Sequence, residues 1–598
     1  VSDEPEQFRD TRLFADKVGI FHRDELINIQ KEVRNITGVT AIIYVQTCAT
    51  ELRRRRKRGF IKDREIKMYI NPDVCEGCGD CAEKSNCVAV KPFNHFEGVK
   101  RQIDQSVCNK DYSCKKGFCP SFIGVNSVDI SQPSKKIFPD LPKSFSNLTN
   151  PKPNLRKIKN IIMAGIGGTG ISTVAAIIVM AARIDKLYAQ SMNFTGLAQK
   201  NGAVTSQIRV SREKSLYFRS ARLPNETADL LLGCDAVVSV SPSITRTLNP
   251  NKTVAIVNGR VEPVGVAGVH IGTVVDDSLL KKHLENHLAL ENLQFIDISK
   301  LAETLVGDTV FANIMMLGIA AQKNLIPINI NSLQKAIELN GVAVEQNLKA
   351  FNWGRLLSEH PQEVFNAAKI DENIDKEKTI DSYNEKFYKT LEHFQDKQYA
   401  DLFLSKVNKI MNLEKNISKF QKNLPLTRKI ALTLFRIMRY KDEYEVARLH
   451  TSGDFAQDFL NKNKGGKLEF YLDPPLFSQK DPETGHLKKQ RFGPWVFNVF
   501  KLLSKFKLLR GSKLDVFGYT EERKRERKLI DKIFYTVEKI SEVLNEENHN
   551  KIIDFLDIPL SIKGYGHVKE KNMDEAEAKW DPSLDKIISN NKLKKLAS

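Results

Sequence analysis

The alternation of apolar and polar positions predicts several elements along the chain. Runs rich in β-branched and other apolar residues predict buried strands at 18–21, 40–45, 158–164, 187–192, 236–240 and 254–257. Apolar positions repeating every three or four residues predict helices at 24–33, 171–184, 310–323, 332–339 and 344–356. Because strands and helices alternate over 156–358, we expect an α/β domain there.

The segment 1–60 holds a single strand–helix–strand unit. One such unit cannot bury both faces of a sheet. We therefore expect 1–60 to be the C-terminal remnant of an α/β domain whose other strands precede Val1.

A segment rich in Pro, Ser and Lys follows at 128–155, without apolar periodicity, and predicts a linker. Beyond 358 the chain is rich in Lys and poor in Gly, and 361–470 has helical spacing. Further helices are expected at 440–450, 520–542 and 548–556, so 359–598 is predicted to be a mostly helical C-terminal extension. The glycine-rich turn at 563–570 of this extension carries His567. His567 could be a ligand or a proton donor. The pattern favours the other interpretation, a structural histidine that caps the turn.

Length and composition indicate how many domains the chain contains and whether it spans a membrane. A chain of 598 residues with 41% hydrophobic residues predicts three or four domains with real cores. The sequence has no apolar run of the ~20 residues that a membrane helix needs and no signal peptide, so we expect a cytoplasmic protein that spans no membrane.

The net charge is +19 and is spread along the chain. A basic surface suits an acidic protein partner, such as a small electron carrier, as well as nucleic acid. The run from Arg53 to Arg58 is a polyanion-binding patch, a solvated exit from its domain, or a site that neutralises a nearby anionic cluster or cofactor. It lacks the interleaved aromatic residues that stack on bases, which makes nucleic-acid binding the weaker interpretation.

Seven of the nine cysteines lie between Cys75 and Cys119. The first three, Cys75, Cys78 and Cys81, are spaced C-x-x-C-x-x-C, and Cys119 precedes a proline. In ferredoxin-like modules this spacing holds three corners of a 4Fe–4S cluster, and a remote Cys-Pro supplies the fourth. We therefore predict a ferredoxin-like module at 61–127 with one cluster on Cys75, Cys78, Cys81 and Cys119.

Cys87, Cys108 and Cys114 remain, one ligand short of a second cluster. A three-cysteine cluster, a non-cysteine ligand, the participation of Cys48 and the absence of a second site all stay open. Zinc is an alternative metal for short cysteine spacings, and disulfides are disfavoured because nothing suggests secretion. No internal repeat is evident from the sequence, and Cys234 lies in an apolar run typical of a core.

The domain at 156–358 opens with a glycine turn between a strand and a helix. Its glycines are Gly165, Gly167, Gly168 and Gly170. Such a turn can bind a phosphate at the helix N-terminus, or can simply join strand to helix, and both interpretations stay open. The next strand ends in Asn193 rather than an acidic residue, which argues against NAD. No residue can be assigned as a catalytic acid or base.

Several of these motifs together resemble the fused indolepyruvate ferredoxin oxidoreductases, which are thiamine-dependent 2-oxoacid:ferredoxin oxidoreductases. The resemblance covers nearly the whole chain and is carried by segments 44–48, 53–59, 74–81, 85–87, 105–111, 117–121, 165–170, 195–202, 337–341, 350–355, 440–449, 492–495 and 564–570.

The resemblance implies four parts: the end of a thiamine pyrophosphate-binding domain, a ferredoxin-like iron–sulfur module, a Rossmann-like γ-type catalytic domain and a helical extension. It implies oxidative decarboxylation of an indolepyruvate or aryl pyruvate-type 2-oxo acid to an acyl-CoA, with electrons passing through iron–sulfur clusters to ferredoxin. The turn at 165–170 and the polar loop at 195–209 become candidates for coenzyme A or a wall of the substrate site.

One departure from the family's motifs limits how much of the family's function can be assigned to this chain. The Gly-Asp-Gly motif that binds the diphosphate and Mg²⁺ in the family is absent here, as is the pyrimidine-binding domain. We expect thiamine pyrophosphate and Mg²⁺ to be held by an upstream half of the enzyme, and a homo-oligomer to assemble from both halves. We also expect this chain alone to oxidise no 2-oxo acid.

Overall fold

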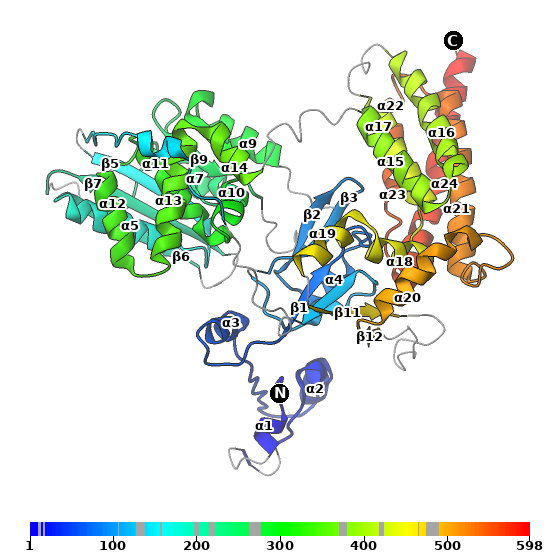
Figure 1. Cartoon of the computed structure of the whole chain (residues 1–598), viewed down its shortest axis with the longest axis horizontal. Coiled ribbons are helices and arrows are strands. Elements are labelled where there is room, and N and C mark those ends of the chain that lie inside the picture. The colour runs from blue at the N-terminus through cyan, green and yellow to red at the C-terminus, as the bar shows by residue number, and fades with distance from the viewer. Residues whose placement is uncertain are drawn as a thin grey trace. The chain divides into compact units, whose positions relative to one another are not determined.

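The computed structural model describes residues 1–9, 14–15, 18–105, 107–126, 138–155, 158–196, 202–214, 220, 222–261, 277–369, 380–417, 424–463, 466–473 and 489–597. The chain divides into two compact units, Val1–Arg64 and Glu65–Ser598 (Figure 1). Each is taken by itself.

The first unit contains helices and no sheet among its described residues. Its elements are α1 (Glu6–Arg9), η1 (Arg23–Glu25), α2 (Leu26–Val33) and α3 (Ala49–Lys57). The expected helix at 24–33 is confirmed. The expected strands at 18–21 and 40–45 are wrong: Ser2 makes only isolated bridges, to His22 and Val45. Without neighbouring strands the apolar run cannot form a ladder, and Ile43 and Tyr44 are 56% and 46% exposed.

The second unit begins with a small α+β module. Strands β1 (Ile66–Ile70) and β4 (Phe122–Asn126) pair antiparallel, and β2 (Val90–His95) forms a hairpin with β3 (Gly98–Ile103). Helix α4 (Asp80–Ser85) follows the first cysteines, and η2 (Ser113–Lys116) contains Cys114.

Two strands of the extension complete this sheet. Strand β11 (Lys467–Leu472) pairs antiparallel with β4, and β12 (Gln490–Phe492) pairs with β11, which gives the order β1-β4-β11-β12. The helical expectation for 361–470 is therefore wrong at its end. Phe470 is buried here at 1% exposure, and the pairing with β4 decides the conformation of this segment.

The α/β domain is built on a six-stranded sheet in the order β10-β9-β8-β5-β7-β6. Its strands are β5 (Ile158–Ile166), β6 (Tyr188–Thr195), β7 (Ala203–Ser211), β8 (Leu230–Gly233), β9 (Val254–Asn258) and β10 (Leu293–Ile296). Strands β5, β8, β9 and β10 are parallel, whereas β7 runs antiparallel to both β5 and β6. The strand that follows the glycine turn and its helix therefore lies at the sheet edge, away from β5.

The expected strand at 236–240 is wrong. Residues Ala236–Ser239 form helix α6, and the strand is β8, directly upstream. The Asp235 carboxylate accepts a 2.8 Å hydrogen bond from the Val238 N–H, which caps the helix. The expected strands at 158–164, 187–192 and 254–257 are confirmed.

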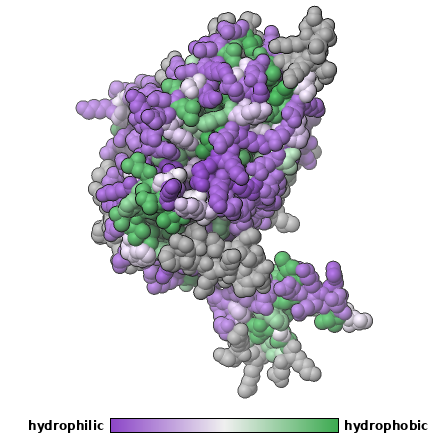
Figure 2. All heavy atoms as spheres, turned by 90° about the vertical axis from the view of Figure 1, so that its right-hand side faces the viewer, coloured by the Kyte–Doolittle hydropathy of each residue, from purple (hydrophilic) through white to green (hydrophobic). Residues whose placement is uncertain are grey.

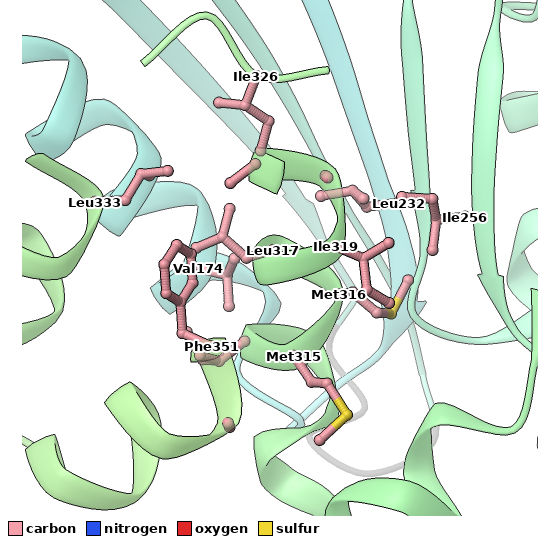
Figure 3. Packing of buried hydrophobic residues seen from close by; sticks show 14 of the residues in the cluster. Val174, Leu232, Ile256, Met315, Met316, Leu317, Ile319, Ile326, Leu333 and Phe351 are labelled. Carbon is pink, nitrogen blue, oxygen red and sulfur yellow. The ribbon is translucent and has the colours of Figure 1, made fainter. Parts of the chain in front are cut away.

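Helices cover both faces of this sheet. One face packs against α5 (Ile171–Ile184), α10 (Ile298–Leu305), α11 (Ala312–Gln322), α12 (Ile330–Asn340) and α13 (Val344–Glu359), and the other against α6, α7 (Pro242–Thr245) and α9 (Asp277–Glu285). Figure 3 shows α11 at the centre of the first layer, where Met316 and Ile319 lie beside Leu232 and Ile256 of the sheet. All four expected helices of this domain are confirmed, together with η5 (Leu290–Asn292), η6 (Thr309–Phe311) and α14 (Pro361–Ala368).

The described part of the predicted linker, 138–155, packs on this domain. It contains η3 (Lys143–Asn147). Leu155 is buried in the core, the Gln322 amide donates to the Thr149 carbonyl at 3.0 Å, and Arg355 donates to Asn150 at 2.7 Å.

The rest of the extension is mostly helical. It comprises α15 (Ile380–Phe394), α16 (Lys397–Lys415), α17 (Pro425–Met438), α18 (Glu443–Thr451), α19 (Asp454–Lys462), α20 (Val496–Leu503), η9 (Ser504–Leu509), α21 (Glu521–Val543), α22 (His549–Phe555), α23 (Asp557–Leu560) and α24 (Gly566–Ala597). Helices α15, α16, α17, α21 and α24 form a bundle around one apolar core (Figure 1). The helices expected at 440–450, 520–542 and 548–556 are confirmed.

The visible surface is largely hydrophilic, with separate hydrophobic patches (Figure 2). Among the described helices, none combines the length and the apolar character needed to cross a membrane.

Candidate iron–sulfur site

Four cysteines surround one small cavity. Cys75 and Cys78 lie in the loop after β1, Cys81 lies in α4, and Cys119 lies just before β4. The cavity is lined by these four residues together with Arg101 and Phe118. All four cysteines are buried, at 6–8% exposure. The structure thus brings the predicted ligand set together. Cys75, Cys78 and Cys81 come from the first loop, which follows β1, and Cys119 comes from the second loop, between η2 and β4.

Glycines allow the tight course of the first loop. Gly77 has φ +69°, and a Cβ on it would lie 2.2 Å from the Val99 carbonyl oxygen. Its N–H donates to the Cys75 sulfur at 3.3 Å, the kind of bond that stabilises cluster thiolates. The Asp80 carboxylate accepts a 2.6 Å hydrogen bond from the Phe118 N–H, which fixes the second loop against α4.

The charge balance favours a positively charged occupant. Burial raises the pKa of the Cys78 and Cys81 thiols, and the charges of neighbouring cysteines raise it further. Arg101 opposes this rise at Cys81, and Lys489 does so at Cys119. Four thiolates around one buried cavity need a cationic group to offset their charge, and this donor set fits a 4Fe–4S cluster. Within the described residues, no group of three or more His, Cys, Asp or Glu is close enough to hold a single metal ion.

The other three cysteines of the module form a second group. Cys114 is buried at 6% exposure, and Cys87 and Cys108 are half-buried. Burial, followed by the nearby charges of Cys87 and Cys108, raises the pKa of Cys114 to about 12. Cys48 is exposed and belongs to the first unit, and Cys234 is buried at the end of β8, as predicted for a core residue.

The extension contacts the backbone of the first cluster loop. The Tyr565 hydroxyl donates to the Val74 carbonyl at 2.6 Å, and the Lys441 ammonium donates to the Cys75 carbonyl at 3.3 Å. The ammonium of Lys489 donates to the Gly117 carbonyl. His450 Nε2 lies 2.9 Å from the carbonyl oxygen of Pro120, the residue after Cys119. Sequence spacing carried no signal for these residues, because they lie hundreds of positions from the cysteines.

A buried ionic network lies beneath this loop. Lys441 pairs with Glu76 at 2.7 Å and with Glu97 at 3.3 Å, and Arg439 also pairs with Glu97. Burial alone would raise the pKa of Glu97, but Arg439, Lys100 and Lys441 hold that pKa well below its usual range. The network thus keeps both carboxylates ionised next to the cluster loop.

The glycine turn of the α/β domain is a separate candidate site. Gly168 and Gly170 both have φ +87°, and Gly170 is the N-cap of α5. The Gly167 N–H donates to the Gly202 carbonyl at 2.8 Å, and Asn313 donates to the Thr169 carbonyl at 2.8 Å. The Gly167 N–H and the Thr169 carbonyl of the turn are thus already hydrogen-bonded within the protein.

Much of the predicted polar loop is strand. Positions 203–209 belong to β7, and 197–201 lie outside the described residues. Arg209 donates to the Asn160 side chain at 3.3 Å and to the Ser220 carbonyl at 2.8 Å, which ties it to its own sheet. The His567 ring lies 4.5 Å from the Phe118 ring, at the start of α24.

Comparison with protein families identifies two regions. Residues 160–357 match the family described as pyruvate ferredoxin/flavodoxin oxidoreductase, and residues 382–582 match a family of unknown function, DUF6537.

Relatives named indolepyruvate oxidoreductase subunit IorB also match part of the chain. The protein from Pyrococcus horikoshii is 27% identical over 199 residues, which are 33% of this chain and 93% of that protein. The protein from Thermococcus kodakarensis is 25% identical over 199 residues, with the same shares covered.

Solved structures also match about a third of the chain. Pyruvate oxidoreductase subunit PORC from Thermotoga maritima is 19% identical, with 33% of this chain and 96% of that chain covered and a TM-score of 0.25. The keto/oxoacid ferredoxin oxidoreductase γ subunit from Geobacter sulfurreducens is 20% identical, with 33% and 98% covered and a TM-score of 0.24. The family model and the named relatives agree on one assignment. Over residues 160–357, this chain is similar to the 2-oxoacid:ferredoxin oxidoreductases.

Proposed function

We propose that this chain is the electron-transfer and γ-type part of a thiamine-dependent 2-oxoacid:ferredoxin oxidoreductase. The reaction is the oxidative decarboxylation of a 2-oxo acid to an acyl-CoA, with ferredoxin as the electron acceptor. The names of the relatives support an indolepyruvate or aryl pyruvate-type substrate. The match of residues 160–357 to an oxidoreductase family does not favour the alternative of a basic nucleic-acid-binding protein.

The observation that carries the proposal is the cavity bounded by Cys75, Cys78, Cys81 and Cys119. These thiolates would hold a 4Fe–4S cluster, which supplies reversible one-electron chemistry when bound. The protein would bury the cluster, the Gly77 amide would donate to one of its ligands, the Cys75 sulfur, and Arg101 would lie beside it. Positive charge and hydrogen bonds near the sulfurs stabilise the reduced state and so raise its reduction potential.

The remaining cofactors are assigned to other places. Thiamine pyrophosphate and Mg²⁺ would be held by the upstream half of the enzyme, because this sequence lacks the Gly-Asp-Gly motif. Coenzyme A would approach the turn formed by Gly165, Gly167, Gly168 and Gly170. Since the Gly167 amide is engaged with Gly202, this assignment rests on the amides at the N-terminus of α5. We also propose that the upstream thiamine-binding half and this chain together form one enzyme, and that this enzyme is a homo-oligomer in the cytoplasm.

Metal analysis with matched cysteine variants tests the proposal. The full chain is purified anaerobically, and iron, acid-labile sulfide and zinc are measured alongside an EPR spectrum of the reduced protein. We expect brown protein that contains iron and sulfide in equal amounts. Cys78→Ser should lose about four irons, whereas Cys234→Ser, which removes a buried thiol of the α/β core, should lose none. Zinc in place of iron, or equal iron in both variants, would overturn the electron-transfer role.

A further inference from the structure

The cysteine module contains an internal duplication that its cysteine count conceals. The first half runs β1, loop, α4, β2, and the second runs β3, loop, η2, β4. The first loop carries Cys75, Cys78 and Cys81 at intervals of three residues. The second carries Cys108, Asp111 and Cys114 at the same intervals. Asp111 therefore occupies the position equivalent to Cys78.

The two halves exchange their last cysteine. Cys119, which follows the second loop, lines the cavity of the first three cysteines. Cys87 follows the first loop and joins the second group: Cys87 and Cys108 both pack against the buried cluster that contains Cys114, the charge of Cys108 acts on Cys87, and the charge of Cys87 acts on Cys114. With this exchange the second group is complete except at the position of Asp111.

Asp111 is the carboxylate that the three thiols share. Burial is the main reason why the pKa of each thiol is raised, and the Asp111 charge raises the pKa of Cys87, Cys108 and Cys114 further. Asp104, the other acidic residue near this group, acts on Cys108 and is paired with Lys91 at 2.8 Å. The shared neighbour of all three sulfurs is therefore Asp111.

Asp111 retains the capacity to bind a metal. Its carboxylate accepts hydrogen bonds from the Ser113 N–H at 3.3 Å and from the Ser113 hydroxyl at 3.0 Å. A carboxylate has about four lone-pair positions on its two oxygens, so one oxygen can bind iron while the other keeps a serine bond. The side chain is exposed, which places this corner of the site at the surface of the module.

We propose that Cys87, Cys108, Cys114 and Asp111 hold a second 4Fe–4S cluster, with the Asp111 carboxylate as the fourth ligand. This rests on the proposed electron-transfer role of the module and extends it to two clusters. A carboxylate is a harder and less electron-donating ligand than a thiolate. The iron bound to Asp111 is thus the most labile of its cluster, and the second cluster has a higher potential than it would have with four cysteines.

The test compares three substitutions in the full chain under anaerobic conditions. The wild type should contain about eight irons and show spin-coupled EPR signals after reduction. Asp111→Ala should lose about one iron and gain the EPR signal of an oxidised three-iron cluster. Asp111→Cys should keep the full iron content and lower the potential of one cluster only. Asp104→Asn, the matched control, should change neither iron content nor spectrum.

The outcomes separate this inference from the proposed function. About four irons in the wild type, lost in Cys78→Ser, would reject the second cluster and leave the first intact. About eight irons with spectra and potentials unchanged by both Asp111 substitutions would show that another group is the ligand. Absence of iron from the wild type would reject both proposals. Asp111→Cys keeps the test decisive if Asp111→Ala does not fold.

Discussion

The Tyr565 hydroxyl donates a 2.6 Å hydrogen bond to the carbonyl oxygen of Val74, the residue before Cys75. The two residues are 491 positions apart, and their exposed fractions are 7% and 0%. The C-terminal extension, within the DUF6537 match, therefore contributes directly to the conformation of the first cluster loop.

Removal of this hydroxyl should loosen the loop. Tyr565→Phe leaves this buried carbonyl with only the longer hydrogen bond from the Lys441 ammonium, at 3.5 Å, which costs about 0.5–1.5 kcal/mol. We expect faster release of iron to a chelator and a lower thermal midpoint. Tyr519→Phe is the matched control, because that tyrosine also donates to a carbonyl, at 2.9 Å, but is 61% exposed. Equal release rates in the two variants would contradict a role for Tyr565 at the cluster loop.

Lys441 should matter more than its single charge suggests. Lys441→Met leaves Glu76 and Glu97 buried with less compensation, and breaking a buried pair in this way costs about 3–5 kcal/mol. We expect a large loss of stability in a denaturant titration, together with loss of iron. Lys389→Met removes an ammonium whose partner Glu385 is 64% exposed, so its midpoint should stay near that of the wild type. A small loss for Lys441→Met would show that water reaches the network.

The first cluster site could be predicted from the sequence because its ligands are local. Cys75, Cys78 and Cys81 have a spacing that few other structures require, and Cys119 precedes proline. The turn from β5 to α5 was predictable for the same reason, since a strand, glycines and an amphipathic helix follow one another directly.

Long-range contacts explain what the sequence could not predict. Strand β11 forms because β4 offers a free edge, although its own sequence continues a helical region. The internal duplication was hidden because Asp111 replaces a cysteine. The apolar run of β8 was assigned six residues too late, because it continues into α6 and only the Asp235 cap separates the two.

His450 should make stability depend on pH. Burial lowers the pKa of His450 to about 4, against an opposing effect of its hydrogen bond to Pro120. The unfolded chain binds this proton near pH 6.5, so between pH 6.5 and pH 4 the unfolded state binds more protons. Stability from this residue is therefore complete above pH 6.5 and is lost as the pH falls, by about 2 kcal/mol between pH 7 and pH 5.

His450→Gln isolates this contribution. Glutamine can still donate to Pro120 and accept from Asn71, but it does not titrate. The variant should be less stable than the wild type at pH 7, and the difference should shrink by pH 5 in denaturant titrations. A difference that is constant from pH 7 to pH 5 would show that His450 titrates normally.

The last prediction concerns the close contact between α11 and α13 in the α/β domain. A Cβ on Gly354 would lie 2.0 Å from the Met315 carbonyl oxygen, and one on Gly318 would lie 2.1 Å from the Phe351 carbonyl oxygen. Because the obstructing atoms are backbone, neither helix can relieve the clash by a rotamer change. Gly354→Ala should thus destabilise this domain by at least the ~1–3 kcal/mol typical of overpacking.

The effect should be confined to the packing of this domain. Gly196→Ala is the matched control, because no atom of the described residues would lie within 4 Å of a Cβ there. We expect a lower denaturation midpoint for Gly354→Ala, an unchanged midpoint for Gly196→Ala, and wild-type iron content in both variants. Equal midpoints for the two variants would mean that α11 and α13 separate without cost, which their buried core residues, Met315, Leu317 and Phe351 among them, argue against.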